Sequence, residues 1–97
     1  VTMVKHIVFF KLPDNSEANK QAVKDRIMSM QGKLDFVKHL EVGLNFSPEE
    51  RAFDVALISD FETKEDLQTY ATHPIHVEVV NFIKSLNAVS KVVDYEY

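Results

Sequence analysis

Two histidines, a tyrosine and a proline lie within one seven-residue segment, residues 70–76, with the sequence YATHPIH. The chain has four histidines, so half of its imidazoles fall in this segment. Neutral imidazole both donates and accepts a hydrogen bond and titrates near neutral pH, which suits acid–base chemistry. His73 and His76 make a poor zinc pattern, because no cysteine or intervening carboxylate completes a ligand set. The segment therefore predicts acid–base chemistry and no metal site.

Composition narrows the classes of protein to which the chain can belong. Its 97 residues suffice for one domain, spanning 1–97, with a single modest core. The net charge of -4 and the pI near 5.5 argue against a nucleic-acid partner. The absence of cysteine excludes disulfides and thiol chemistry. No apolar run approaches the roughly 20 residues that span a membrane, and no signal-peptide pattern opens the chain, so we predict a cytoplasmic protein.

The first half of the chain predicts a strand and a helix. Residues 3–11 are rich in β-branched and aromatic side chains and end at a turn cluster, which is typical of a strand. A helix is expected from about Ser16, with Asn15 or Ser16 as its N-cap and Gly32 as its stop. Its core side is Val23, Ile27, Met30 and Leu34, and its solvent side is Lys20, Gln21, Lys24 and Asp25.

The second half predicts three more strands and two helices. Alternating apolar residues favour strands over 37–46 and 52–61, and the last strand is expected over 88–97. Thr63 resembles the first residue of a capping box that opens a short helix. Because Pro74 cannot continue that helix but is favoured at the first position of a new one, His73 marks the junction, and a further helix runs to about Leu86.

The order strand, helix, strand, strand, helix, strand predicts a ferredoxin-like α+β fold, in which helices cover one face of a four-stranded antiparallel sheet. The strands carry a second apolar set that these helices cannot cover, and such a patch is larger than monomers usually expose. We therefore predict a homodimer whose sheets face each other. The predicted contact residues are Met3, Ile7, Phe9, Ala56, Ile58, Val89, Val93 and Tyr95.

Four polar side chains are expected on the face that the helices cover. His6 and Asp94 lie on neighbouring strands, and Tyr70 and His76 come from the helical segments above them. Asp94 is expected to accept a hydrogen bond from His76, which would fix the tautomer of that ring and raise its basicity. The alternative is structural, because buried polar groups also form networks that only hold a core together.

Three segments resemble a known family: residues 4–8 (VKHIV), 70–76 (YATHPIH) and 93–95 (VDY). Together they are similar to the stress-responsive dimeric A/B barrel family, Dabb, along nearly the whole chain. The resemblance implies a ferredoxin-like monomer and a homodimeric α/β barrel. Most members of that family have no assigned reaction.

One relative in that family is the plant polyketide cyclase that forms olivetolic acid. There a tyrosine and a histidine perform the acid–base steps, with an aspartate of the last strand and a histidine of the first. The resemblance implies these catalytic roles for Tyr70, His76, Asp94 and His6. The aromatic residues with which the cyclase lines its alkyl pocket are not matched on the first helix, so the resemblance does not carry over the substrate. The residues that we expect to line a small apolar pocket are Val8, Phe10, Ile27 and Leu57.

Two hypotheses of function follow. The first is an enzyme without a cofactor, in which His76 removes a proton next to a carbonyl group and Tyr70 donates to the developing enolate oxygen. The second is a stress-response or ligand-binding domain without a reaction, in which the same residues hold the helix junction in place. The haem-degrading relatives use a tryptophan that this chain lacks, which counts against that class.

Overall fold

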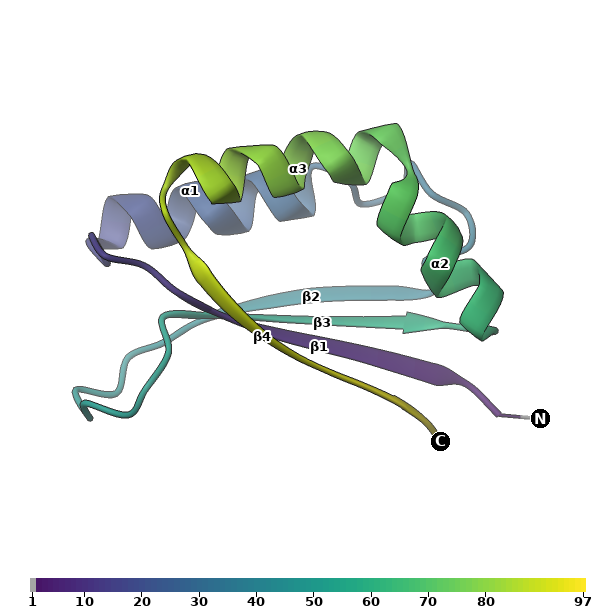
Figure 1. The fold of residues 1–97 in the computed structure, drawn as a ribbon, viewed down its shortest axis with the longest axis horizontal. Coiled ribbons are helices and arrows are strands. Elements are labelled where there is room, and N and C mark those ends of the chain that lie inside the picture. Colours follow the sequence, from purple (N-terminus) through teal and green to yellow (C-terminus); the bar gives the residue numbers. More distant parts are fainter. Residues whose placement is uncertain (1) are drawn as a thin grey trace.

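The computed structural model describes residues 2–97. The elements are β1 (Val4–Lys11), α1 (Glu17–Met28), β2 (His39–Leu44), β3 (Val55–Phe61), α2 (Lys64–Thr72), α3 (Pro74–Ser85) and β4 (Val89–Glu96). The strands form one antiparallel sheet in the order β2-β3-β1-β4, and the helices lie on one of its faces (Figure 1). The predicted ferredoxin-like α+β fold is confirmed.

The register of the strands decides which side chains meet the helices. Val8 of β1 stands between Leu57 of β3 and Val92 of β4, and His6 stands between Ser59 and Asp94. Because successive side chains alternate between the two faces, each of these rows points to the helices. The core between the layers consists of Val4, Val8, Phe10, Leu12, Val23, Ile27, Met30, Leu34, Leu40, Val42, Val55, Leu57, Phe61, Tyr70, Val79 and Ile83.

Each helix begins at a residue whose side chain accepts a backbone hydrogen bond. Ser16 Oγ accepts from the amide of Asn19, and Thr63 Oγ1 accepts from that of Asp66. His73 Nδ1 accepts from the amide of Ile75 at 3.1 Å, so this histidine caps α3 directly before Pro74. The helix starts predicted at Ser16, Thr63 and His73 are confirmed.

The first helix differs from its prediction in two respects. It ends at Met28, and turns rather than helix lead to Gly32, whose φ of 80° lies in the left-handed region. Lys20 is buried and does not belong to the solvent side. Its ammonium group donates to the backbone carbonyl of Asn45 at 3.0 Å and pairs with Glu17 at 2.7 Å, which compensates the charge.

The two middle strands are shorter than their alternating pattern predicts. The amide of Asn45 donates to the carbonyl of Asp54, which closes the ladder and leaves residues 46–53 as a loop. Phe46, expected in a strand, is 98% exposed on this loop. Phe53, which the predicted strand over 52–61 includes, instead lies before β3 and contacts the ring of Phe9 on the open face.

The last strand is the least covered element. All eight residues of β4 are exposed, and within the described residues β4 pairs only with β1. None of the described residues forms a layer on the side of the sheet away from the helices (Figure 1). No helix among residues 2–97 has the length and apolar character needed to cross a membrane.

Candidate functional site

A cavity of about 320 Å³ lies between the helices and the sheet. His6, Tyr70 and His76 are on its lining, together with all four residues predicted to line a pocket, Val8, Phe10, Ile27 and Leu57. The strands contribute one wall, α1 and α3 the other, and residues 70–76 close one end. A volume of about 300 Å³ or more is typical of small-molecule sites. Three of the four predicted site residues therefore share one cavity.

His6 and Asp94 form the most direct polar contact of the site. They are register partners on β1 and β4, and His6 Nδ1 donates to the carboxylate of Asp94 at 2.5 Å. An ionised carboxylate only accepts, so Nδ1 of the ring carries the proton of this bond, and in the neutral ring Nε2 is then the acceptor. The prediction that Asp94 supports His76 is wrong in this structure. Asp94 is 44% exposed at the sheet edge and does not line the cavity.

His76 finds its partner in the backbone of the preceding helix. Its Nδ1 donates to the carbonyl of Ala71 at 3.2 Å. That carbonyl belongs to the last turn of α2, where the interruption before Pro74 leaves carbonyl groups without a partner in the helix. Burial lowers the pKa of His76, and the neighbouring imidazoles of His6 and His73 lower it further, against the opposing effect of the Ala71 carbonyl. The ring is therefore neutral near pH 7, with a free lone pair on Nε2.

The ring of Tyr70 packs against the imidazole rings of both His6 and His76. Its ring centroid lies 4.0 Å from that of His76 and 6.1 Å from that of His6, and it also packs against Phe61. The side chain is buried, and no described residue accepts a hydrogen bond from its hydroxyl. Burial raises the pKa of Tyr70, which keeps the phenol neutral.

The remaining two histidines take other places. His73 caps α3 and packs against the ring of Phe36, which fits the predicted architectural role. His39 is exposed on β2, where its Nε2 pairs with Glu41 at 3.1 Å. Among residues 2–97 no three histidine, aspartate or glutamate side chains gather in a way that could hold a metal ion.

Sequence reasoning missed the polar residues at the other end of the cavity. Lys84 of α3 and Ser90 of β4 lie on the lining, and neither was a candidate. Ser90 is the register partner of Phe10, four residues along β1 from His6. The alternation of β4 contains a signal for Ser90, because Ser90, Val92 and Asp94 share one face. Helix spacing contains a signal for Lys84, because Lys84 lies four residues after Val80 and eight after His76 on the same face of α3.

The fold and the cavity define a class of protein: a ferredoxin-like α+β domain with a histidine-bearing apolar pocket. Residues 4–97 match the family described as the stress responsive A/B barrel domain, Dabb. The chain belongs to this family.

Two curated relatives from Arabidopsis thaliana are both named as stress-response A/B barrel domain-containing proteins. The first is 37% identical over 79 residues, which is 80% of this chain and 30% of that relative. The second, DABB1, is 31% identical over 99 residues, which is 97% of this chain and 47% of DABB1. The chain thus spans less than half the length of both relatives.

A solved structure shows the same architecture. A dimeric protein of unknown function with a ferredoxin-like fold, from Bacteroides fragilis, superposes with a TM-score of 0.84 at 36% identity. The match covers 98% of this chain and 96% of that one. A dimeric neighbour of this fold therefore exists, and that neighbour is described as a protein of unknown function.

Proposed function

We propose that this protein is a homodimer whose cavity binds a small, largely apolar compound with a carbonyl group, and that His6 and His76 transfer a proton there without a cofactor. One observation carries the proposal. Both imidazoles line the same cavity, and each uses Nδ1 as a donor to a protein oxygen, which leaves Nε2 as a proton acceptor.

The two imidazoles differ in role because their partners differ. The carboxylate of Asp94 stabilises a positive charge on His6, whereas the carbonyl of Ala71 offers His76 only a dipole. Burial lowers the pKa of His76, so that ring is neutral near pH 7 and has no proton on Nε2 to donate. We assign the proton abstraction to Nε2 of His6; the imidazolium that forms keeps this proton and returns it to the ligand, either directly or through the free Nε2 of His76. Asp94 acts as a positioning residue, since it touches His6 and not the cavity.

Tyr70 is the candidate donor to the carbonyl oxygen of the ligand. Burial keeps its phenol neutral, and no described residue competes for its proton. A neutral donor aimed at a developing oxyanion stabilises the enolate that proton abstraction forms. The hydroxyl is buried in this structure, so the Tyr70 side chain or its cover must move for the bond to form.

The lining also suggests the shape of the ligand. The middle of the cavity is apolar, with Val8, Ile27 and Val92 among its walls. Polar groups lie at both ends: the imidazoles at one, and Lys84 with Ser90 at the other. We propose an elongated ligand with a carbonyl group near the imidazoles and an acidic or hydroxyl group near Lys84.

The competing hypothesis is a purely structural network. It is supported by the curated relatives, whose names give a stress response and no reaction. A structural network satisfies its members, because an unpartnered buried polar group destabilises a fold by about 1 to 3 kcal/mol. Here His6 binds Asp94, His76 binds the backbone, and the Tyr70 hydroxyl has no partner among the described residues. A buried hydroxyl group without a partner among the described residues favours a binding or catalytic role over a structural network.

A ligand screen tests the cavity directly. Small aromatic and aliphatic ketones would be screened by ligand-observed NMR against the wild type and against Ile27→Trp, which fills the cavity. Binding to the wild type that the filled variant loses supports the proposal. Equal binding to both proteins, or none with the wild type, contradicts it.

Proton transfer has its own test. Exchange of the α-protons of a bound ketone into deuterated water would be followed by NMR for the wild type, His6→Gln and His39→Gln. We expect the His6 variant to lose the exchange and the surface His39 variant to keep it. Binding without exchange in the wild type would leave a binding domain and overturn the catalytic part.

The homodimer is proposed through the open face of the sheet. Phe9, Val89, Val93 and Tyr95 are exposed there, as the prediction requires, and Ile7 and Ile58 are half-buried between them. Burying such side chains contributes roughly 25 cal/mol per Å² of apolar surface, which offsets the cost of association. Sedimentation at micromolar concentration should give a dimer. A monomer would contradict the proposal.

A further inference from the structure

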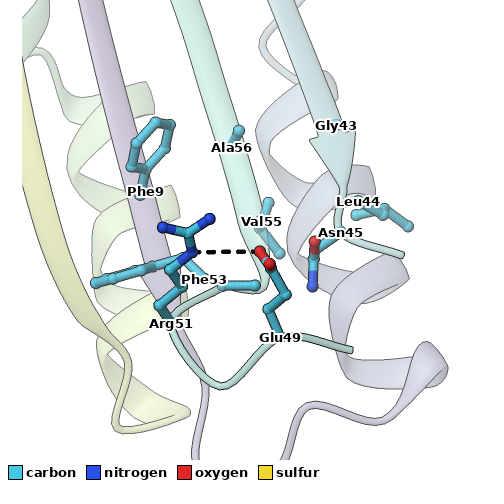
Figure 2. Close-up of a pocket in the computed structure, with 10 residues that line it drawn as sticks. Phe9, Gly43, Leu44, Asn45, Glu49, Arg51, Phe53, Val55 and Ala56 are labelled. Carbon is cyan, nitrogen blue, oxygen red and sulfur yellow. Dashed lines mark hydrogen bonds and ion pairs between the residues drawn. The ribbon is translucent and has the colours of Figure 1, made fainter. Parts of the chain in front are cut away.

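The open face of the sheet has a hollow at one corner. About 490 Å³ of space lies beside β2 and β3, where the loop of residues 46–53 rises from the sheet (Figure 2). Gly43 and Ala56 form its small-residue floor, and Phe9 and Phe53 form aromatic walls. Arg51 and Glu49 pair at 3.3 Å on the rim. An apolar hollow with an aromatic wall is suited to another aromatic side chain.

The same face has an aromatic projection at another corner. Tyr95 and Tyr97 are about half exposed, and their rings stack edge to face with centroids 6.2 Å apart. The ammonium group of Lys5 lies 4.8 Å from the ring centre of Tyr97. Backbone bonds between Tyr97 and Met3 hold the end of the strand on β1. These contacts arrange the two rings as a preformed projection, which we call the tyrosine corner.

The strand register places the hollow and the tyrosine corner diagonally opposite each other. Phe9, Ala56 and Gly43 form one row across β1, β3 and β2, toward the β2 edge. Tyr95 is the register partner of Lys5, four residues earlier on β1, and lies on the β4 edge. The two features therefore differ both in their edge of the sheet and in their end of the strands.

A two-fold axis can bring these corners together in a dimer. When two sheets stack face to face, an axis that lies between them along the other diagonal exchanges the two corners. Each tyrosine corner then meets the hollow of the other copy, and the contact occurs twice, as an isologous interface requires. The strands of the two sheets cross at nearly right angles, which is one of the two common sheet packings.

We infer that the hollow lined by Phe9, Gly43 and Ala56 receives the tyrosine corner of a second copy of this chain. The inference rests on the proposed homodimer and goes beyond it, because it assigns the orientation of the two sheets. It also links the interface to the cavity. β4 carries Tyr95 on its outer side and Asp94 on its inner side, so a partner that holds the tyrosine corner also holds the carboxylate that orients His6.

Gly43 offers a test that leaves the protomer intact. A Cβ atom at this position meets no atom within 4 Å, and its φ is not positive, so a larger residue fits the strand. Gly43→Leu should fill the hollow and weaken the dimer about tenfold or more, because overpacking excludes the partner's ring. The double variant Tyr95→Ala/Tyr97→Ala should weaken it as well. Phe46→Ala is the matched control, since this exposed residue does not line the hollow.

Mixing the two weakened proteins gives the decisive measurement. In a heterodimer, the filled hollow of the Gly43→Leu protomer faces the truncated corner, while the native hollow faces the native tyrosines. Native mass spectrometry should therefore show the heterodimer in excess over both homodimers. The inference is overturned if Gly43→Leu leaves the dissociation constant of the dimer unchanged while the wild type dimerises. It is also overturned if mixing the two variants gives no excess of the heterodimer over the homodimers. A monomeric wild type overturns the proposed homodimer itself.

Discussion

The carboxylate of Asp94 accepts a hydrogen bond from His6 across two neighbouring strands, at 2.5 Å. The pair is formed by strand register alone, since both side chains point to the helices from adjacent positions on β1 and β4. His76 instead donates a hydrogen bond to the backbone of α2, so the two imidazoles of the cavity are oriented by different elements.

Asp94→Ala should release the ring of His6. Without the acceptor, Nδ1 loses its fixed proton and the imidazole samples both tautomers, which ¹⁵N NMR of the ring nitrogens reports. The free energy of unfolding should fall by only about 1 kcal/mol, because the carboxylate is partly exposed. Asp94→Asn, which can still accept, should keep the tautomer. A single tautomer in Asp94→Ala would show that another group orients His6.

His76 should make the protein less stable in mild acid. Because burial lowers its pKa in the folded state, the unfolded chain binds a proton below about pH 6.5 that the folded protein refuses until a lower pH. Stability is therefore present above pH 6.5 and is lost as the pH falls through the lowered pKa. Urea denaturation from pH 7.5 to 5 should show a smaller loss for His76→Gln than for the wild type.

The control for that experiment is His39→Gln, which removes an exposed imidazole from β2. It should lose stability with falling pH as the wild type does. If the two variants behave alike, the acid sensitivity does not come from His76.

The hydroxyl of Tyr70 should contribute nothing to stability. No described residue pairs with this buried group, so Tyr70→Phe removes a polar atom that destabilises the core. The free energy of unfolding should stay constant or rise by up to about 1 kcal/mol, measured by urea denaturation. Tyr70→Ala should lower it by about 3 to 5 kcal/mol, because the ring fills the core beneath both histidines. A large loss in Tyr70→Phe would reveal a hydrogen-bond partner of the hydroxyl.

His73 should act through the helix junction and not through chemistry. Its Nδ1 accepts from the amide of Ile75, so His73→Ala should lower the free energy of unfolding by about 1 kcal/mol. His73→Asp should restore most of that loss, because aspartate is a good N-cap. Thermal unfolding of the two variants measures the difference. Equal destabilisation by alanine and aspartate would mean that the imidazole ring itself is required.

Local rules account for most of the fold. Alternation along β1 identified the core side with Val8 and Phe10, and capping chemistry located the starts of the helices at Ser16, Thr63 and His73. The boundaries failed where tertiary contacts override the pattern. Phe46 continues the alternation of β2, yet the strand stops earlier because Asn45 and Asp54 close the ladder. Lys20 has the composition of a surface residue and is buried by the loop that it binds.

The sequence alone determined which residue types share a layer, because strand alternation and helix spacing are local properties of the chain. It placed His6, Tyr70, His76 and Asp94 over one face of the sheet. Only the tertiary structure decided how these four residues pair, because their hydrogen bonds depend on the strand register and on the position of α3. Sequence spacing does not determine either of these. The tertiary structure paired Asp94 with His6, left the Tyr70 hydroxyl without a partner among the described residues, and placed Lys84 on the lining of the same cavity.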